Sequence, residues 1–536
     1  MKFSEQKIKN WHSFYYNEGI EIISLPDFFN HIRLANSNPE YKVKATNLGI
    51  EFNCDNPFSM HCFNIYTLIA ITKSLLINIK KRNKTLLLGH SEGIDAKIYE
   101  LFKRSFSHKS IKLLEYNTNV INEFIIINTT LGIDVDYYIY LYKNPFNNNY
   151  YIKIYHDLFL ISVNEQKQLL NNVFEFDKQI ILHNFYNLFI LKIDKFFSFY
   201  KLKLENQKHL FLENQIDRNN LNIKIAINNP VDNNILQSLL NSLGFNVKEA
   251  SNLRIQERSK NLFWIFFKWN LFTYQKSKTD FLITFDKKNR YNFFFNINDR
   301  YIKINNEELI YFYINYFFLQ WKNENKLQQN KVIITHSVSK NIINLLNNFN
   351  IPYEFAEKSD TKNVLFANIL EHFCANNNQA LEFSNLQFII DICQMLLSYK
   401  NNNNLLDYKY LKMRNYFKNT IYIVKKIKIP FFKATNLATF FQVNQSISRN
   451  YRISRIEQLN AYNTYSYEFL NLEIQNKKQQ VFNICIYYDF NRESLIFKQE
   501  HNFEYTQIKY YLNKFKGLHL NNIIIKYVKK YLNKQN

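Results

Sequence analysis

The hydrophobic positions in the first part of the chain switch repeatedly between helical and strand spacing. From Asn64 to Arg82 the apolar residues fall at helical spacing, Asn64 stands at the N-cap, and three basic residues stand at the negative end of the helix dipole. The pattern of apolar residues that follows predicts four further elements: a strand at Thr85–Gly89, a helix capped by Asp95, a strand at Ile111–Tyr116 and a strand at Val135–Tyr142. Strands alternating with helices of this length predict an α/β architecture with a largely parallel sheet.

This alternation recurs twice and then stops. The second unit is predicted from a strand at Asn222–Asn228, a helix at Asn233–Leu243 closed by Gly244, and a strand at Phe281–Phe285. The third has a strand at Lys331–Thr335 and a helix at Ser339–Phe349. The last hundred residues read differently, with strands at Val481–Tyr488 and Leu495–Lys498 and a helix at Thr506–Lys514. We therefore expect three successive α/β domains with mixed or parallel sheets, at 1–205, 206–325 and 326–430, followed by a smaller α+β domain at 431–536.

Composition supports several domains and excludes some phosphate-binding sites. A chain of 536 residues and 65.0 kDa exceeds what one hydrophobic core usually holds. Its seven glycines are far fewer than the roughly 38 expected at an average usage of about 7%. No GxGxxG and no GxxxxGK[ST] occurs, which argues against a dinucleotide fingerprint or a P-loop. Heavy use of Phe, Tyr, Asn, Lys and Ile is typical of an AT-rich genome.

The net charge of +23 suggests anionic partners, but its distribution favours a simpler explanation. Lysines are spread along the whole chain rather than gathered in one run, so a solvated basic surface is expected and nucleic acid is not an expected partner. Five cysteines without a CxxC indicate a reducing compartment and offer no zinc site. The N-terminus is polar and the most apolar window, Ile180–Phe197, is interrupted by charged and amide residues, so we expect a cytoplasmic protein without a membrane span.

One stretch points to a family. The apolar run from Leu131 leads into Tyr142-Lys143-Asn144-Pro145, and a turn of asparagines follows. This resembles the active-site strand and loop of the phosphohexomutases, the phosphoglucomutase and phosphomannomutase enzymes, where the loop reads Thr-Ala-Ser-His-Asn-Pro and the serine carries the phosphoryl group. Four other segments resemble family motifs in the same order: Asn64–Thr67, Lys224–Val247, Asn306-Glu307 and Leu405–Tyr408. The resemblance reaches most of the chain and implies three α/β domains, one α+β domain and interconversion of hexose 1- and 6-phosphates.

The functional parts that the resemblance implies are degenerate. Tyr142 stands where the nucleophilic serine is expected, and Asn53 stands where the N-terminal loop carries an arginine. The magnesium loop of alternating aspartates keeps only Asp286, followed by two lysines. The sugar-recognition loop with its glutamates has no counterpart between Leu365 and Gln379, and the phosphate loop at 488–494 lacks its glycine and leading arginine. Arg492 and Lys143 remain as candidate phosphate-binding residues.

The leading hypothesis is therefore a phosphohexomutase-like protein that is catalytically inactive or strongly impaired. One alternative is a divergent but active phosphomannomutase or phosphoglucomutase, and a second is a basic anion-binding scaffold. No cofactor is expected, with Mg²⁺ needed if the protein is active. Sugar phosphates and an unidentified protein are the expected partners. For Tyr142, Lys143, Asn144 and Pro145 an ordinary structural turn is the competing interpretation, because turn formers persist where the loop geometry requires them.

Overall fold

The computed structural model describes residues 4–534 apart from 21–22, 47–48, 80–83, 119, 130–133, 144–147, 157–158, 177–178, 207–217, 227–229, 250–278, 286–290, 357–363, 371, 376–385, 403–404, 436, 463–465, 493 and 504. The chain divides into two compact units, each described here by itself. The first consists of Met1–Phe211 and Pro230–Ser242, and the second of Leu212–Asn229 and Leu243–Asn536.

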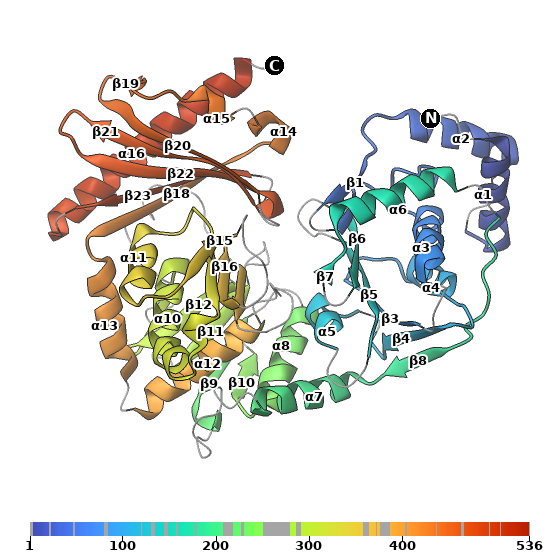
Figure 1. Ribbon diagram of the computed structural model, residues 1–536, viewed down its shortest axis with the longest axis horizontal. Coiled ribbons are helices and arrows are strands. Elements are labelled where there is room, and N and C mark those ends of the chain that lie inside the picture. The colour runs from blue at the N-terminus through green and yellow to red at the C-terminus, as the bar shows by residue number, and fades with distance from the viewer. Residues whose placement is uncertain are drawn as a thin grey trace. The chain divides into compact units, whose positions relative to one another are not determined.

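A mixed sheet forms the centre of the first unit (Figure 1). Its strand order is β1-β2-β6-β5-β3-β4-β8, and β7 pairs with β6. The strands are β1 (Val43–Thr46), β2 (Gly49–Phe52), β3 (Lys84–His90), β4 (Ile111–Tyr116), β5 (Tyr137–Lys143), β6 (Tyr150–His156), β7 (Phe159–Leu160) and β8 (Leu188–Leu191). The half of the sheet made of β5, β3, β4 and β8 is parallel. The other half is antiparallel, with β6 paired to β5, β2 to β6 and β1 to β2.

Two helices of the first unit begin where their caps predict. The helices of this unit are α1 (Glu5–Asn17), α2 (Leu25–Ser37), α3 (Ile65–Ile79), α4 (Ala96–Ser105), α5 (Glu123–Asn128), α6 (Val163–Glu175), α7 (Ile193–Asn206) and α8 (Pro230–Ser242). Asn64 caps α3, since its Oδ1 accepts a hydrogen bond from the Thr67 amide at 2.9 Å, and Asp95 caps α4 in the same way through the Ile98 amide. Both predicted caps are confirmed. In the core, the Trp11 ring of α1 stacks on Tyr66 of α3, with centroids 4.3 Å apart.

Two smaller α/β sheets open the second unit. The first has the order β10-β9-β11-β12-β13 and the second β15-β14-β16-β17. Their strands are β9 (Asn222–Ala226), β10 (Asn246–Glu249), β11 (Phe281–Phe285), β12 (Tyr291–Ile297), β13 (Arg300–Ile304), β14 (Lys331–Ile334), β15 (Tyr353–Phe355), β16 (Val364–Ile369) and β17 (His372–Ala375). Short 3₁₀ turns lie at η2 (Arg218–Asn220) and η3 (Lys326–Gln328), and the helices are α10 (Asn306–Asn323), α11 (Lys340–Asn348), α12 (Leu386–Asn401) and α13 (Leu405–Phe417). In the first sheet β10, β9 and β11 pair in parallel, and β12 and β13 are added antiparallel. In the second sheet β15, β14 and β16 pair in parallel, and β17 is added antiparallel.

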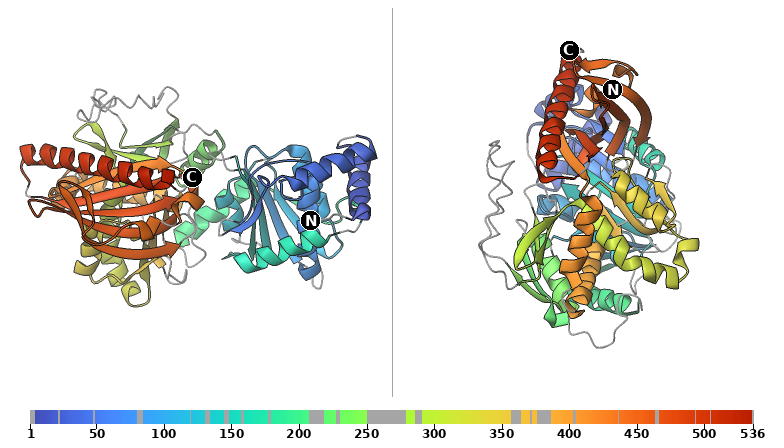
Figure 2. Two further views of the ribbon diagram at one scale, coloured as in Figure 1. Left: turned by 90° about the horizontal axis from the view of Figure 1, so that it is seen from above. Right: turned by 90° about the vertical axis from the view of Figure 1, so that its left-hand side faces the viewer.

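The C-terminal part of the second unit is an antiparallel sheet covered by one long helix. The strand order is β18-β23-β22-β21-β20-β19. The elements are β18 (Thr420–Lys428), α14 (Phe431–Ala434), α15 (Leu437–Phe440), β19 (Ser446–Ser448), β20 (Tyr451–Tyr462), β21 (Ser466–Asn476), β22 (Val481–Asp489), η4 (Phe490–Arg492), β23 (Ser494–Asn502) and α16 (Gln507–Lys534). Figure 2 shows α16 running along one face of this sheet. The predicted fold class, α/β units followed by α+β, is confirmed; the predicted domain boundaries stay a prediction.

The predicted end of the last helix, at Lys514, is wrong. α16 continues to Lys534, because apolar side chains at four-residue spacing keep one face of the helix on the sheet. These are Leu520, Ile524, Val528 and Leu532, all buried. Gly517 lies in the middle of the helix, where glycine is unfavourable in isolation. It allows the helix to approach the sheet: a Cβ at this position would lie 2.5 Å from Ile423 Cδ1 and 2.9 Å from Gln499 Nε2.

We expect Gly517→Ala to destabilise the C-terminal part by about 1–3 kcal/mol, because the added methyl group has no space against the sheet. The gain in helix propensity, about 1 kcal/mol, does not offset this overlap. Urea unfolding followed by circular dichroism measures the change. Asn522→Ala, on the exposed side of the same helix, is the matched control and should change stability little. Equal stability of the two variants would contradict the close approach.

A buried carboxyl group lies between α10 and α12. Asp391 is 3% exposed, accepts a hydrogen bond from the Tyr313 hydroxyl at 2.7 Å and accepts another from Gln387 Nε2 at 2.8 Å. Burial raises the pKa of Asp391 to about 7, although both hydrogen bonds favour the charged form. The folded chain therefore holds this proton more tightly than the unfolded chain does.

Because the folded pKa of Asp391 is raised, its effect on stability has a defined sign. The group favours folding most below its unfolded pKa of about 3.9, and this contribution declines as the pH rises to about 7. Asp391→Asn removes the titration, so stability of the variant relative to the natural chain should improve by about 3 kcal/mol between pH 4 and 7. Urea unfolding at several pH values tests this. A difference that stays constant with pH would show that Asp391 remains ionised in the folded chain.

Candidate functional site

Tyr142, at the nucleophile position, lies near the end of β5 inside a ladder of aromatic side chains. It pairs with Tyr151 of β6, with ring centroids 6.0 Å apart, and the Tyr140 ring lies 6.3 Å away on the same face. The Lys153 ammonium lies over the Tyr142 ring, 5.0 Å from its centroid. Glu123 of α5 accepts from that ammonium at 2.8 Å, so the cation is held in place. The ring of Tyr142 is thus covered by a fixed cation. Asn144 and Pro145 lie outside the described residues.

Lys143 lies on the opposite face of β5, because successive side chains of a strand alternate. Its amide donates to Ser91 Oγ at 2.8 Å, and its ammonium lies 4.9 Å from the Tyr150 ring centroid. The hydrogen bond with the Tyr150 hydroxyl raises the pKa of Lys143, so the lysine stays charged. The Tyr150 hydroxyl in turn donates to Asp55 Oδ2 at 2.9 Å. Tyr142 and Lys143 therefore belong to two separate networks.

The neighbouring strand β2 adds a carboxylate that the sequence analysis did not single out. Glu51 Oε1 accepts hydrogen bonds from Asn149 Nδ2 at 2.6 Å and from the Tyr151 hydroxyl at 3.0 Å. Asn53, at the expected arginine position, instead joins two backbone groups: its Oδ1 accepts from the Lys42 amide and its Nδ2 donates to the Glu40 carbonyl. The position at which the resemblance implies a guanidinium thus holds an amide bound to the backbone, and the nearby charged group of β2, Glu51, is negative.

Of the other two predicted site residues, Asp286 and Arg492, the structure describes only Arg492. Asp286, the remaining metal-loop carboxylate, lies outside the described residues. Within the described part of the chain, no group of three or more His, Cys, Asp or Glu residues could hold a metal ion. Arg492 lies in η4, between β22 and β23, and its Nε is 3.1 Å from Asp489 Oδ2. The Arg492 amide also donates to Asp489 Oδ1, and both side chains are mostly buried. Asp489 therefore balances the charge of Arg492, the residue predicted to bind phosphate.

Two buried glutamates of the C-terminal sheet form a polar site that sequence reasoning missed. Glu468 of β21 is fully buried, and its two carboxylate oxygens accept from the backbone amides of His336 and Ser337 at 3.0 and 2.9 Å. Burial raises the pKa of Glu468, although those amides favour its charged form. An alternating strand pattern gives no signal for such a residue, because its partners lie 131 residues and more away in sequence.

Glu500 of β23 repeats this arrangement at the N-terminus of α11. Its carboxylate accepts from the Lys340 amide at 3.1 Å and from the Ser339 hydroxyl at 3.3 Å, and burial raises its pKa. The Ser339 hydroxyl also shares a hydrogen bond of 2.7 Å with the Tyr422 hydroxyl. Close by, the Lys498 ammonium forms an ion pair with Glu307. The Lys340 and Asn341 amides at the start of α11, which could otherwise receive an anionic ligand, are thus bound by Glu500 and by Ser339 Oγ.

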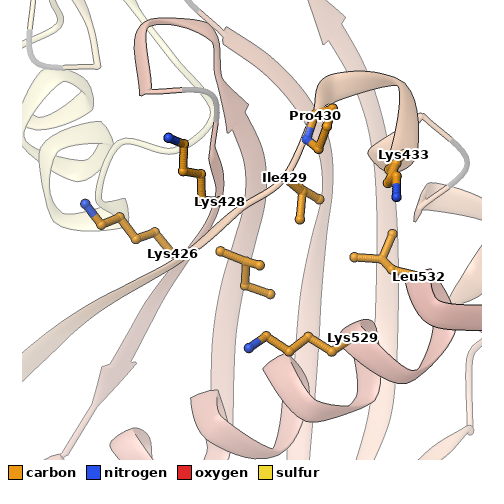
Figure 3. A pocket seen from close by; sticks show the side chains of 8 residues that line it. Lys426, Lys428, Ile429, Pro430, Lys433, Lys529 and Leu532 are labelled. Carbon is orange, nitrogen blue, oxygen red and sulfur yellow. The ribbon is translucent and has the colours of Figure 1, made fainter. Parts of the chain in front are cut away.

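A pocket of about 640 Å³ lies where the end of β18 meets α14 and α16. Its lining, as far as the described residues form it, consists of Lys426, Ile427, Lys428, Ile429, Pro430, Lys433, Lys529 and Leu532. Figure 3 shows the amino groups of Lys426, Lys428 and Lys529 on one side of the apolar residues Ile429 and Leu532. An apolar floor with basic groups at its margin suits an anion that carries an apolar part.

Comparison with known proteins decides the fold. No model of a protein family and no curated protein matches the chain. Solved structures do match: a phosphoglucomutase/phosphomannomutase family protein from Burkholderia thailandensis has a TM-score of 0.54 over 82% of this chain and 90% of its own, at 8% identity. The exocytosis-sensitive phosphoprotein parafusin, a phosphoglucomutase from Paramecium in its open form, has a TM-score of 0.53 over 86% of this chain and 91% of its own, at 10% identity. This chain has the phosphohexomutase fold. At these identities the likeness establishes the fold alone, and the roles of Tyr142, Lys143, Asp286 and Arg492 stay predictions.

We expect Glu468→Ala to remove the carboxylate from two buried amides and to cost about 2 kcal/mol or more in stability, because each unsatisfied buried group costs about 1–3 kcal/mol. Hydrogen exchange provides a local measurement. The amides of His336 and Ser337 should exchange faster, whereas the Lys340 amide, bound by Glu500, should keep its protection. Unchanged exchange at residues 336 and 337 would show that Glu468 does not hold this segment.

Proposed function

We propose that this protein keeps the phosphohexomutase fold without phosphohexomutase turnover, and that its remaining activity is the binding of anionic ligands such as sugar phosphates. The observation that carries the proposal is the environment of Tyr142. Phosphoryl transfer depends almost entirely on positioning and charge stabilisation. A tyrosine hydroxyl lies several ångströms further from its backbone than a serine Oγ, and here the ring is stacked in a strand ladder beneath the Lys153 ammonium.

Charges around the candidate site further support the proposal. Glu51 adds a carboxylate beside Tyr151, and Asp489 binds the guanidinium of Arg492. A doubly charged phosphoryl group needs cations or amide donors that are available to it. In other enzymes, loss of the covalent nucleophile costs on the order of 10⁶ in turnover. Together these features favour loss of catalysis over a rearranged mechanism.

The candidate binding groups are Lys143 and Arg492, as the sequence predicts, and Lys143 is the stronger of the two because Asp489 balances the charge of Arg492. Lys143 stays charged because its hydrogen bond to Tyr150 raises its pKa. Lysine binds phosphate as a point charge and needs no special loop. Weak binding of a hexose phosphate by such residues requires no metal ion; Mg²⁺ would be needed only if transfer chemistry persists.

The test is ³¹P NMR of the purified chain with glucose 1-phosphate or mannose 1-phosphate, Mg²⁺ and a hexose 1,6-bisphosphate primer. We expect no 6-phosphate signal from folded protein. Thermal stabilisation by the sugar phosphate alone should show binding, and Lys143→Gln should reduce that stabilisation. Lys167→Gln, an exposed lysine on α6, is the charge-matched control.

Formation of the 6-phosphate at enzyme-like rates would overturn the proposal in favour of a divergent active mutase. Tyr142→Phe then identifies the phosphoryl carrier, since it removes only the hydroxyl group. Absence of both turnover and stabilisation would overturn the binding half of the proposal as well.

A further inference from the structure

The outward face of α16 carries a continuous apolar stripe. Ile508, Leu512 and Phe515 are 76%, 55% and 61% exposed, and their spacing of four and three residues places them on one side of the helix. Tyr505, just before the helix, and Tyr511, beside these three residues, are about half exposed. Together the five residues form what we call the α16 stripe. Exposed apolar side chains occur singly on most proteins, whereas a contiguous row of them marks an interaction surface.

The α16 stripe is separate from the hydrophobic core of this domain. The opposite side of the same helix is fixed to the sheet by buried residues, among them Asn513, Gly517 and Leu520. Figure 2 shows the helix lying along the outside of the sheet. The stripe therefore points away from the sheet and is held rigidly in that orientation.

The charge of α16 identifies the kind of partner. The helix contains seven lysines and no acidic residue. Exposed Lys509 and Lys516 lie along one side of the α16 stripe, and Lys526 and Lys530 continue its face toward the C-terminus, at about 100° per residue. An apolar block at 508–515 is thus followed by a basic block at 526–530 along one face about 33 Å long, at about 1.5 Å per residue.

This pattern favours a flat anionic surface over other occupants. A second copy of the chain would bring the same lysines together across a twofold axis, which costs repulsion. A helix-binding groove would cover anchors at i, i+4 and i+7 but would leave the lysines at 526 and 530 unused. Interfacial helices have this arrangement: apolar residues enter the boundary between headgroups and acyl chains, tyrosines lie at that level, and lysines contact anionic headgroups.

We propose that the outward face of α16 docks the protein on membranes that contain anionic phospholipids. The attachment is peripheral, and within the described residues no helix has both the length and the apolar character needed to span a bilayer. This inference is independent of the sugar-phosphate proposal, because it rests on different residues and a different ligand.

The test is sedimentation of the full chain with large unilamellar vesicles of phosphatidylcholine, with and without about one third phosphatidylglycerol. We expect binding to the anionic vesicles and at least tenfold weaker binding to phosphatidylcholine alone. The triple variant I508Q, L512Q and F515Q should weaken binding at least tenfold. The double variant K526Q and K530Q should weaken it about fivefold for each lysine removed. Both variants change exposed side chains, so the fold should persist.

The matched control is Leu319→Gln, which removes an equally exposed apolar side chain, 65% exposed, from α10. It should leave vesicle binding unchanged. The proposal is overturned if the natural chain does not bind anionic vesicles, or if Leu319→Gln weakens binding as much as the stripe variant does. It is also overturned if sedimentation equilibrium shows a dimer that the stripe variant abolishes, because a second copy would then cover the α16 stripe.

Discussion

Two buried carboxylates hold the C-terminal sheet against the segment that runs from β14 into α11. Glu468 and Glu500 belong to neighbouring parts of the C-terminal sheet, yet their hydrogen-bond partners lie in the segment between β14 and α11. A buried carboxylate is tolerated only when donors satisfy it, so these contacts fix where the sheet lies on the α/β part. Burial raises the pKa of both glutamates, which shows that the arrangement is maintained against a cost of desolvation.

These contacts also limit what the scaffold can do chemically. Amides at a helix N-terminus are natural anion-binding groups, and in this chain they are occupied internally. Near β5, the ring of Tyr142 lies beneath the Lys153 ammonium, whereas Lys143 is hydrogen-bonded to Tyr150 and keeps its charge. Packing and internal hydrogen bonds can therefore maintain this fold without any contribution from loop chemistry. Fold and chemistry are separable in this way because function depends on a few positioned groups.

α16 combines two roles that usually belong to different helices. One side supplies core residues such as Ile524 and Val528, and Gly517 allows close approach to the sheet. The other side is basic and apolar and points outward. A surface helix normally has a polar outer face, so the outward apolar residues have no explanation in the stability of this domain. They acquire one if the helix also contacts an anionic surface.

The sequence by itself determined the order and type of the elements. Caps such as Asn64 and Asp95 and the alternation of strand and helix spacing act over three or four residues, and the structure confirms both the caps and the α/β-then-α+β order. The resemblance of short segments, in the right order, to phosphohexomutase motifs predicted the right fold, while the roles of the residues in those segments stay predictions. Tertiary structure alone decided the length of α16 and the partners of Glu468. Those outcomes depend on contacts between residues more than a hundred positions apart, or on packing that makes a glycine acceptable within a helix, and no local pattern encodes them.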